Sequence, residues 1–276
     1  LIMRAAYGDT ALGRTILGTK ESLADIDSGM MRKYLQSHYT TENTVIAISG
    51  HFDDSIFELL EEYFGKRDIS NDKVEALSAD YRSGKIIKSK DCEQVQLVAG
   101  FRGIDITDER IYSLLVFNNI FGEGMSSRLF QNIRESEGLV YSIYAYHSMY
   151  RDTGMFNIAA GMNPKNFDRV TELIGKEIKK AQTEKLTEDE VARAKEQLKG
   201  NYILSYENTG SRMQSAGRSL LMDKPIYSPE EVLNKIDAVD CTSVGEIVEE
   251  ILRKDMLSIA VVGAVSEDKE INIDCK

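Results

Sequence analysis

An arginine and a tyrosine stand seven residues apart in the middle of the chain, at Arg134 and Tyr141. A guanidinium carries a fixed charge and five hydrogen-bond donors, and a phenol can donate one hydrogen bond to an oxygen that gains charge. If the chain reverses between them, both side chains lie at the same opening on the surface and can hold a polar substrate between them. The alternative interpretation is a helix-to-strand connection whose arginine pairs with a surface glutamate.

The flanking sequence predicts such a reversal. Residues 122–127 hold two glycines that loosen the backbone, and Ser126 or Ser127 can cap a helix by accepting a bond from a first-turn amide. Apolar residues between 129 and 133 recur at helical spacing, which predicts a buried helix face. Gly138 can end that helix in a left-handed turn, and residues 140–146 are typical of a strand.

These residues also carry a resemblance. The run Ser-Ser-Arg-Leu-Phe, Ile-Arg-Glu and Gly-Leu-Val-Tyr over residues 126–141 resembles the second lobe of the insulinase/pitrilysin family of zinc metallopeptidases, which includes the mitochondrial processing peptidases. The resemblance implies that Arg134 binds the substrate backbone and that Tyr141 donates a hydrogen bond to the oxyanion of the tetrahedral intermediate. One such preorganised donor is typically worth about 2.7–4 kcal/mol of transition-state stabilisation.

The zinc site of that family is His-x-x-Glu-His on a helix with a distant glutamate as third protein ligand. This chain has three histidines, at 38, 51 and 147, none followed by Glu-His and no two at ligand spacing. The resemblance therefore implies zinc in the complete enzyme and none bound by this chain. We expect the chain alone to hydrolyse no peptide through zinc.

The resemblance runs through nearly the whole chain and implies an α+β fold of two related α/β lobes, each a mixed sheet packed against helices. We expect the C-terminal part of the first, zinc-bearing lobe at residues 1–68, a linker at 69–91 and the complete second lobe at 92–276. The first lobe would be incomplete at its N-terminus, because residues 1–7 have the pattern of the middle of a helix.

Apolar periodicity predicts the individual elements. A helix ending near residue 38 would bury a stripe of five apolar side chains, and residues 44–50 would form a strand buried on both faces, as would residues 257–263. Residues 140–150 and 154–161 predict a hairpin, and residues 167–183 an amphipathic helix. Thr187 and Glu190 have the spacing of a capping box that begins a long helix. The five apolar side chains on the helix that ends near residue 38 are those of Leu23, Ile26, Met30, Tyr34 and Leu35.

Composition excludes other classes of protein. The net charge of −11 argues against nucleic acid and against an anionic membrane surface, both of which attract basic patches. No apolar run approaches the roughly 20 residues that span a bilayer. The three cysteines, at 92, 241 and 275, are widely spaced and lack metal-ligand pairing, which favours reduced thiols and a cytoplasmic protein.

The most direct interpretation is a portion of a zinc-dependent endopeptidase that acts on short or unfolded polypeptides and supplies the substrate-binding half. The alternatives are a non-catalytic partner subunit and a structural homologue such as the respiratory-complex core proteins. Retention of both Arg134 and Tyr141 favours the enzyme. An incomplete first lobe would expose a sheet edge and apolar surface, so the expected partner is the missing zinc-binding segment or a second copy of the chain.

Overall fold

The computed structural model describes residues 1–65 and 79–275. They belong to two compact units, each assembled from separate stretches of the chain. The first unit joins residues 1–14, 78–200 and 231–276, and the second joins residues 15–77 and 201–230. Residues 69–78 of the predicted linker lie outside the described residues, and the boundaries predicted for the two lobes stay a prediction.

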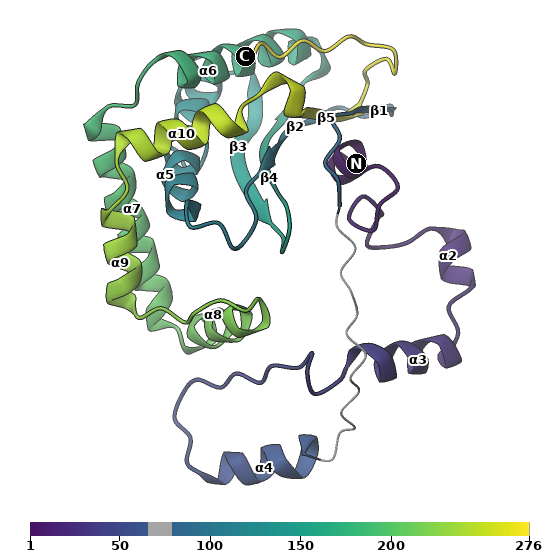
Figure 1. Ribbon diagram of the computed structural model, residues 1–276. Coiled ribbons are helices and arrows are strands. Elements are labelled where there is room, and N and C mark those ends of the chain that lie inside the picture. The colour runs from purple at the N-terminus through teal and green to yellow at the C-terminus, as the bar shows by residue number, and fades with distance from the viewer. Residues whose placement is uncertain (66–78, 276) are drawn as a thin grey trace. The chain divides into compact units, whose positions relative to one another are not determined.

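A five-stranded mixed sheet organises the first unit, in the order β1-β5-β2-β4-β3 (Figure 1). β1 and β5 pair in parallel, and every other pair is antiparallel. β3 and β4 form the predicted hairpin, whereas β1 lies inside the predicted linker and was not expected. The strands are β1 (Lys85–Ser89), β2 (Val95–Gly103), β3 (Val140–Met149), β4 (Gly154–Met162) and β5 (Leu257–Gly263).

The main hydrophobic core lies between one face of this sheet and three helices, α5 (Ile111–Phe121), α6 (Phe167–Thr183) and α10 (Cys241–Ile251). Alternate residues of β2 point into it, and Phe117 of α5 packs on Phe156 of β4 with ring centroids 5.3 Å apart. The amphipathic pattern of residues 167–183 is thereby confirmed as a helix that buries one side. This α/β layering confirms the predicted fold class.

The opposite face of the sheet receives α1 (Ile2–Tyr7), the short helix at the start of the chain. Tyr7 is fully buried, and its hydroxyl makes a 3.0 Å hydrogen bond with Thr153 Oγ1 and donates to the Gly154 carbonyl at 3.1 Å. The Tyr81 hydroxyl donates to the carbonyls of Gly100 and Met256. Both phenols thereby join segments distant in sequence to the sheet.

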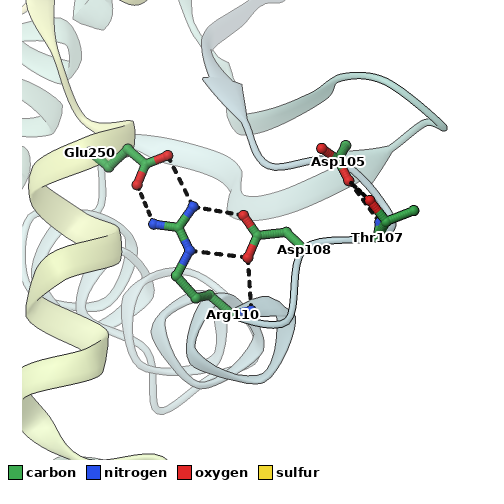
Figure 2. A network of polar contacts seen from close by, with 5 residues as sticks. All are labelled: Asp105, Thr107, Asp108, Arg110 and Glu250. Atoms are coloured by element: carbon green, nitrogen blue, oxygen red, sulfur yellow. Dashed lines mark hydrogen bonds and ion pairs between the residues drawn. The ribbon is translucent and has the colours of Figure 1, made fainter.

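An ion-pair network ties the loop before α5 to α10 (Figure 2). The Arg110 guanidinium donates to both carboxylate oxygens of Asp108, at 2.6 and 3.0 Å, and also bridges to Glu250. In the same loop, Asp105 accepts the backbone amide and the hydroxyl of Thr107. These contacts fix the entry of the chain into α5, which in turn leads into the segment of residues 122–141.

The second unit is helical where it is described. The predicted strand at residues 44–50 is wrong: it forms no strand, and Val45, Ile46 and Ile48 are 36–42% exposed. A strand needs a neighbour for its amides and carbonyls, and none of the described residues pairs with this segment. Its helices are α2 (Lys20–Ala24), α3 (Ser28–His38), α4 (Ser55–Phe64) and α8 (Thr209–Leu221).

The apolar stripe before residue 38 lies on α2, on α3 and between them, but its side chains are 47–55% exposed, so the predicted burial is wrong for this unit taken by itself. None of α2, α3 and α4 contains a buried residue. The predicted single helix is two helices, α2 and α3, separated by residues 25–27, and the stripe that they carry is not buried. The remaining helices are α7 (Glu188–Glu207), α9 (Pro229–Asp237) and two 3₁₀ turns, Pro164–Asn166 and Lys254–Met256.

Candidate functional site

The segment that carries Arg134 and Tyr141 begins in a tight loop after α5. Gly122 approaches β3 so closely that its carbonyl accepts the Ala145 amide at 3.1 Å. Gly124 has a φ of 84°, a conformation that favours glycine, and the buried Ser127 hydroxyl donates to its carbonyl at 2.8 Å. Ser127 therefore closes the loop, where the sequence predicted that a serine would cap the helix.

The predicted helix forms, but its second half is a π-helix, Phe130–Glu135. The Ser136 amide bonds to the Gln131 carbonyl five residues back, at 3.0 Å, and the Ser136 hydroxyl donates to the same oxygen at 2.8 Å. Ile133 is fully buried, as the helical spacing predicted. π-helices are rare and are frequently found at functional sites, so the geometry of this stretch is a reason to look for function here.

Gly138 then ends the helix as predicted, with a φ of 64° and its amide bonded to the Arg134 carbonyl at 3.1 Å. This left-handed residue reverses the chain and leads it into β3, against which the π-helix packs. Arg134 and Tyr141 thus lie on two adjacent elements on either side of one sharp turn.

Both side chains are exposed, and neither forms a hydrogen bond to another side chain in the described part of the chain. The Arg134 guanidinium lies over the Phe130 ring, 4.8 Å from its centroid, and forms no ion pair with any carboxylate in the described part of the chain. Tyr141 is 54% exposed and sits at a bulge in the β3–β4 pairing, between Val140 and Ser142. Bulges re-aim side chains and are frequent beside active sites.

An ion pair that the sequence did not predict holds this segment in place. Arg128, at the start of the helix, donates through Nε and Nη2 to one carboxylate oxygen of Glu190 on α7, at 2.9 and 2.7 Å. Burial of Glu190 raises the pKa of its carboxyl, but hydrogen bonds from Thr187 and Arg128 outweigh burial and hold that pKa below its usual value. The partners are 62 positions apart in the sequence, which explains why spacing alone could not reveal the pair.

Within residues 1–65 and 79–275, neither the histidines nor the carboxylates and thiols form a metal site. Among the residues that the structure describes, no three His, Cys, Asp or Glu side chains come together. His38 stacks on Tyr34 at the end of α3, and His51 is exposed in a loop. His147 lies on β3, and burial lowers the pKa of its imidazole while the charge of Glu123 opposes that change. The described residues therefore do not fit a zinc ion.

Comparison with known proteins decides the family. The family described as "Peptidase M16 inactive domain" matches residues 25–198, which is more than half of the chain. The chain belongs to the peptidase M16 family. The resemblance seen in residues 126–141 of this M16 chain is thereby confirmed at the level of the family.

Curated relatives of the M16 chain are named zinc proteases. It is 34% identical to the uncharacterized zinc protease YmxG of Bacillus subtilis over 255 residues, which cover 92% of the chain and 62% of that protein. It is 30% identical to an uncharacterized zinc protease of Streptomyces coelicolor over 276 residues, with coverages of 97% and 60%. The M16 chain thus spans about three fifths of the length of these relatives.

Solved structures share its fold. A chain of complex III2 from Candida albicans superposes with a TM-score of 0.87 at 23% identity, covering 98% of the M16 chain and 67% of that chain. A peptidase M16 inactive domain from Pseudomonas fluorescens gives 0.85 at 20% identity, with coverages of 98% and 65%. These likenesses show the fold alone, and the roles of Arg134 and Tyr141 stay predictions. No described helix is both long and apolar enough to cross a membrane.

Proposed function

We propose that the chain is the substrate-binding half of a zinc-dependent endopeptidase that acts on short or unfolded polypeptides. The observation that carries this proposal is Arg134, an exposed guanidinium without an ion pair among the described residues, held on a π-helix beside the bulge that presents Tyr141. A structural joint would pair such an arginine with a nearby carboxylate. An unpaired cation next to an exposed phenol instead matches a polar ligand with carbonyl oxygens.

In this proposal the two residues act at different moments. The Arg134 guanidinium donates to backbone carbonyls of a bound peptide, so it contributes in the ground state and the transition state alike. The Tyr141 hydroxyl donates to the carbonyl oxygen of the scissile bond as negative charge develops there, so it contributes mainly in the transition state. Neither role depends on the side chain of the substrate, which fits an enzyme of broad peptide preference.

Zinc in the complete enzyme would be held by residues outside this chain, since the described residues offer no ligand set. The proposed partner is therefore a zinc-bearing polypeptide, in the same protein or in a second chain, or a second copy of this chain. The relatives are named zinc proteases and are longer than the chain, which supports a division of this kind. We propose a cytoplasmic location, on the basis of three free cysteines.

The test is steady-state kinetics on a quenched fluorescent peptide with the zinc-bearing polypeptide supplied. Tyr141→Phe should lower kcat on the order of 10²–10³-fold, the cost typical of one oxyanion donor. Arg134→Ala should act mainly by raising KM. Full kcat in Tyr141→Phe with an unchanged KM in Arg134→Ala would show that the pair is only a structural joint.

A second candidate is a non-catalytic partner subunit of an active peptidase. The fold of a respiratory complex III chain and the family description as an inactive domain favour this alternative. Peptide binding distinguishes the two proposals. A partner subunit with a purely structural role would bind no peptide through Arg134, whereas the substrate-binding half of an enzyme would do so even without zinc.

A further inference from the structure

The contact between Arg128 and Glu190 joins the start of the helix that carries Arg134 to the start of α7. Two guanidinium nitrogens converge on one carboxylate oxygen, and the side chains are only 14% and 21% exposed. Charge-assisted hydrogen bonds of this length, shielded from water, restrict both side chains more than a surface ion pair does. The contact therefore acts as a fixed point for the segment that follows Arg128.

Hydrogen bonds to the other carboxylate oxygen of Glu190 also hold this side chain in place. Its Oε2 accepts the backbone amide of Thr187 at 3.0 Å and the hydroxyl of Thr187 at 2.9 Å, and its own amide bonds to that hydroxyl at 3.2 Å. This is the capping box that the sequence predicted, and it closes the N-terminus of α7. One carboxylate thus caps α7 and anchors Arg128 at the same time.

Stability alone does not account for Arg128. Its third nitrogen, Nη1, is buried and has no hydrogen-bond partner within the described residues. A buried donor without a partner is costly, and an apolar side chain of similar length would avoid that cost. An arginine at this position is better explained by its ion pair with Glu190, which orients the helix.

The structure between Arg128 and Arg134 is rigid enough to transmit that direction. Leu129 and Ile133 are fully buried in the core, and the Gln131 side chain donates to the Met125 carbonyl at 2.6 Å. The π-helix is closed by the two bonds from Ser136 described above. A shift at the first turn would therefore move the exposed guanidinium at the last turn.

We propose that Arg128 is a positioning residue, which through Glu190 sets the orientation of the π-helix and so the place of the Arg134 guanidinium. The proposal rests on the proposed function, in which Arg134 binds the peptide backbone. It does not require Arg128 to touch the peptide.

The experiment compares five forms of the whole chain: wild type, Arg134→Ala, Arg128→Lys, Thr187→Ala and the double variant Arg128→Met with Glu190→Gln. The double variant removes the ion pair without leaving a buried charge, and its glutamine can still accept from Thr187. Thr187→Ala is the matched control, because it weakens the same helix cap and leaves Arg128 paired. The probe is a fluorescein-labelled random-coil peptide of alanine, glycine and serine, and affinity is measured by anisotropy.

We expect Arg134→Ala and the double variant each to weaken peptide binding roughly tenfold. The affinity of Arg128→Lys should lie between those variants and wild type. Thr187→Ala should bind the peptide as wild type does. Hydrogen exchange supplies a second measurement that needs no ligand. The Ser136 amide, which closes the π-helix, should exchange faster in the double variant than in Thr187→Ala.

The outcomes separate the two proposals. If Arg134→Ala binds peptide as well as wild type does, the proposed function fails, and the exchange of the Ser136 amide alone decides whether Arg128 orients the π-helix. If Arg134→Ala weakens binding but the double variant does not, the positioning role is wrong and the proposed function stands. Equal loss of affinity in Thr187→Ala and the double variant would also overturn it, because any weakening of α7 would then suffice.

Discussion

Gly122 is the position at which the candidate site is most sensitive to a single methyl group. A Cβ placed on it would lie 2.3 Å from the Ala145 Cβ and 2.4 Å from the Ala145 backbone nitrogen. Both distances are far inside normal contact, and the second involves backbone, which cannot turn away as a side chain can. Gly122→Ala must therefore push the loop off β3 and break the hydrogen bond from the Ala145 amide to the Gly122 carbonyl.

The expected cost follows from these two effects. Forcing an extra carbon into a packed position costs about 1–3 kcal/mol, and losing a backbone hydrogen bond next to the core adds about 1 kcal/mol. Together they predict a loss of about 2–4 kcal/mol in the free energy of unfolding. For a chain of this size, that corresponds to a fall in Tm on the order of 10 °C.

Gly245→Ala is the matched control, because Gly245 lies within α10 and a Cβ there would meet nothing within 4 Å. In a helix that change should stabilise by about 0.5–1 kcal/mol. Both variants are compared with wild type by calorimetry and by urea denaturation followed by circular dichroism. Should Gly122→Ala melt within a degree or so of wild type, the close approach of the loop to β3 is not a structural requirement and the reasoning is refuted.

Two further predictions concern charge. Arg110→Met should destabilise by about 1 kcal/mol, because it opens the network to Asp108 and Glu250. The effect should be smaller in high salt, because the side chains of Arg110 and Glu250 are 42% and 50% exposed, and urea denaturation at two salt concentrations checks this. Wild-type Tm should fall more steeply than that of His147→Gln as pH drops below 6.5. Burial lowers the pKa of His147 in the folded protein, so the unfolded chain binds the proton first and folding loses stability; thermal melts from pH 7 to 5 show whether the two curves diverge.

Local patterns predicted the parts of the fold whose cause is local. The helix at residues 167–183, the hairpin of β3 and β4 and the capping box at Thr187 each follow from side chains within a few residues of one another. The left-handed turn at Gly138 belongs to the same class, since glycine alone adopts that conformation without steric cost. Sequence reasoning therefore located the reversal between Arg134 and Tyr141 correctly.

The finer geometry of the site could not be predicted in this way. A π-helix differs from an α-helix by one residue in its hydrogen-bond spacing, and residues 130–135 carry no composition that distinguishes the two. The bulge at Tyr141 likewise depends on how β3 registers against β4 over its whole length. Apolar spacing identifies Leu129 and Ile133 as buried, but it fixes neither the hydrogen-bond spacing of the helix nor the register of the strand that follows.

The two failed predictions in residues 15–65 have a common physical cause. Periodicity indicates which side chains of a segment are more stable when they are buried away from water. It does not indicate which part of the protein buries them. Val45, Ile46 and Ile48 have the pattern of a buried strand, and the described residues give them neither a neighbouring strand nor a covering layer. In the first unit, the same kind of pattern at Leu257–Gly263 does form a buried strand, because β1 and β2 flank it on both sides.

Glu190 shows why a site can be identified from sequence more easily than the contacts that orient it. Its pairing with Thr187 is a local event that a three-residue spacing reveals, whereas its pairing with Arg128 requires that α7 begin beside the start of the π-helix. β3, β4 and α6 lie between the two residues along the chain, and the arrangement of these elements brings the two charges together. A residue that binds a ligand is recognisable by its own chemistry, but a residue that positions it is recognisable only from its contacts. For this reason the positioning role that we propose for Arg128 follows from its contact with Glu190 and not from the sequence.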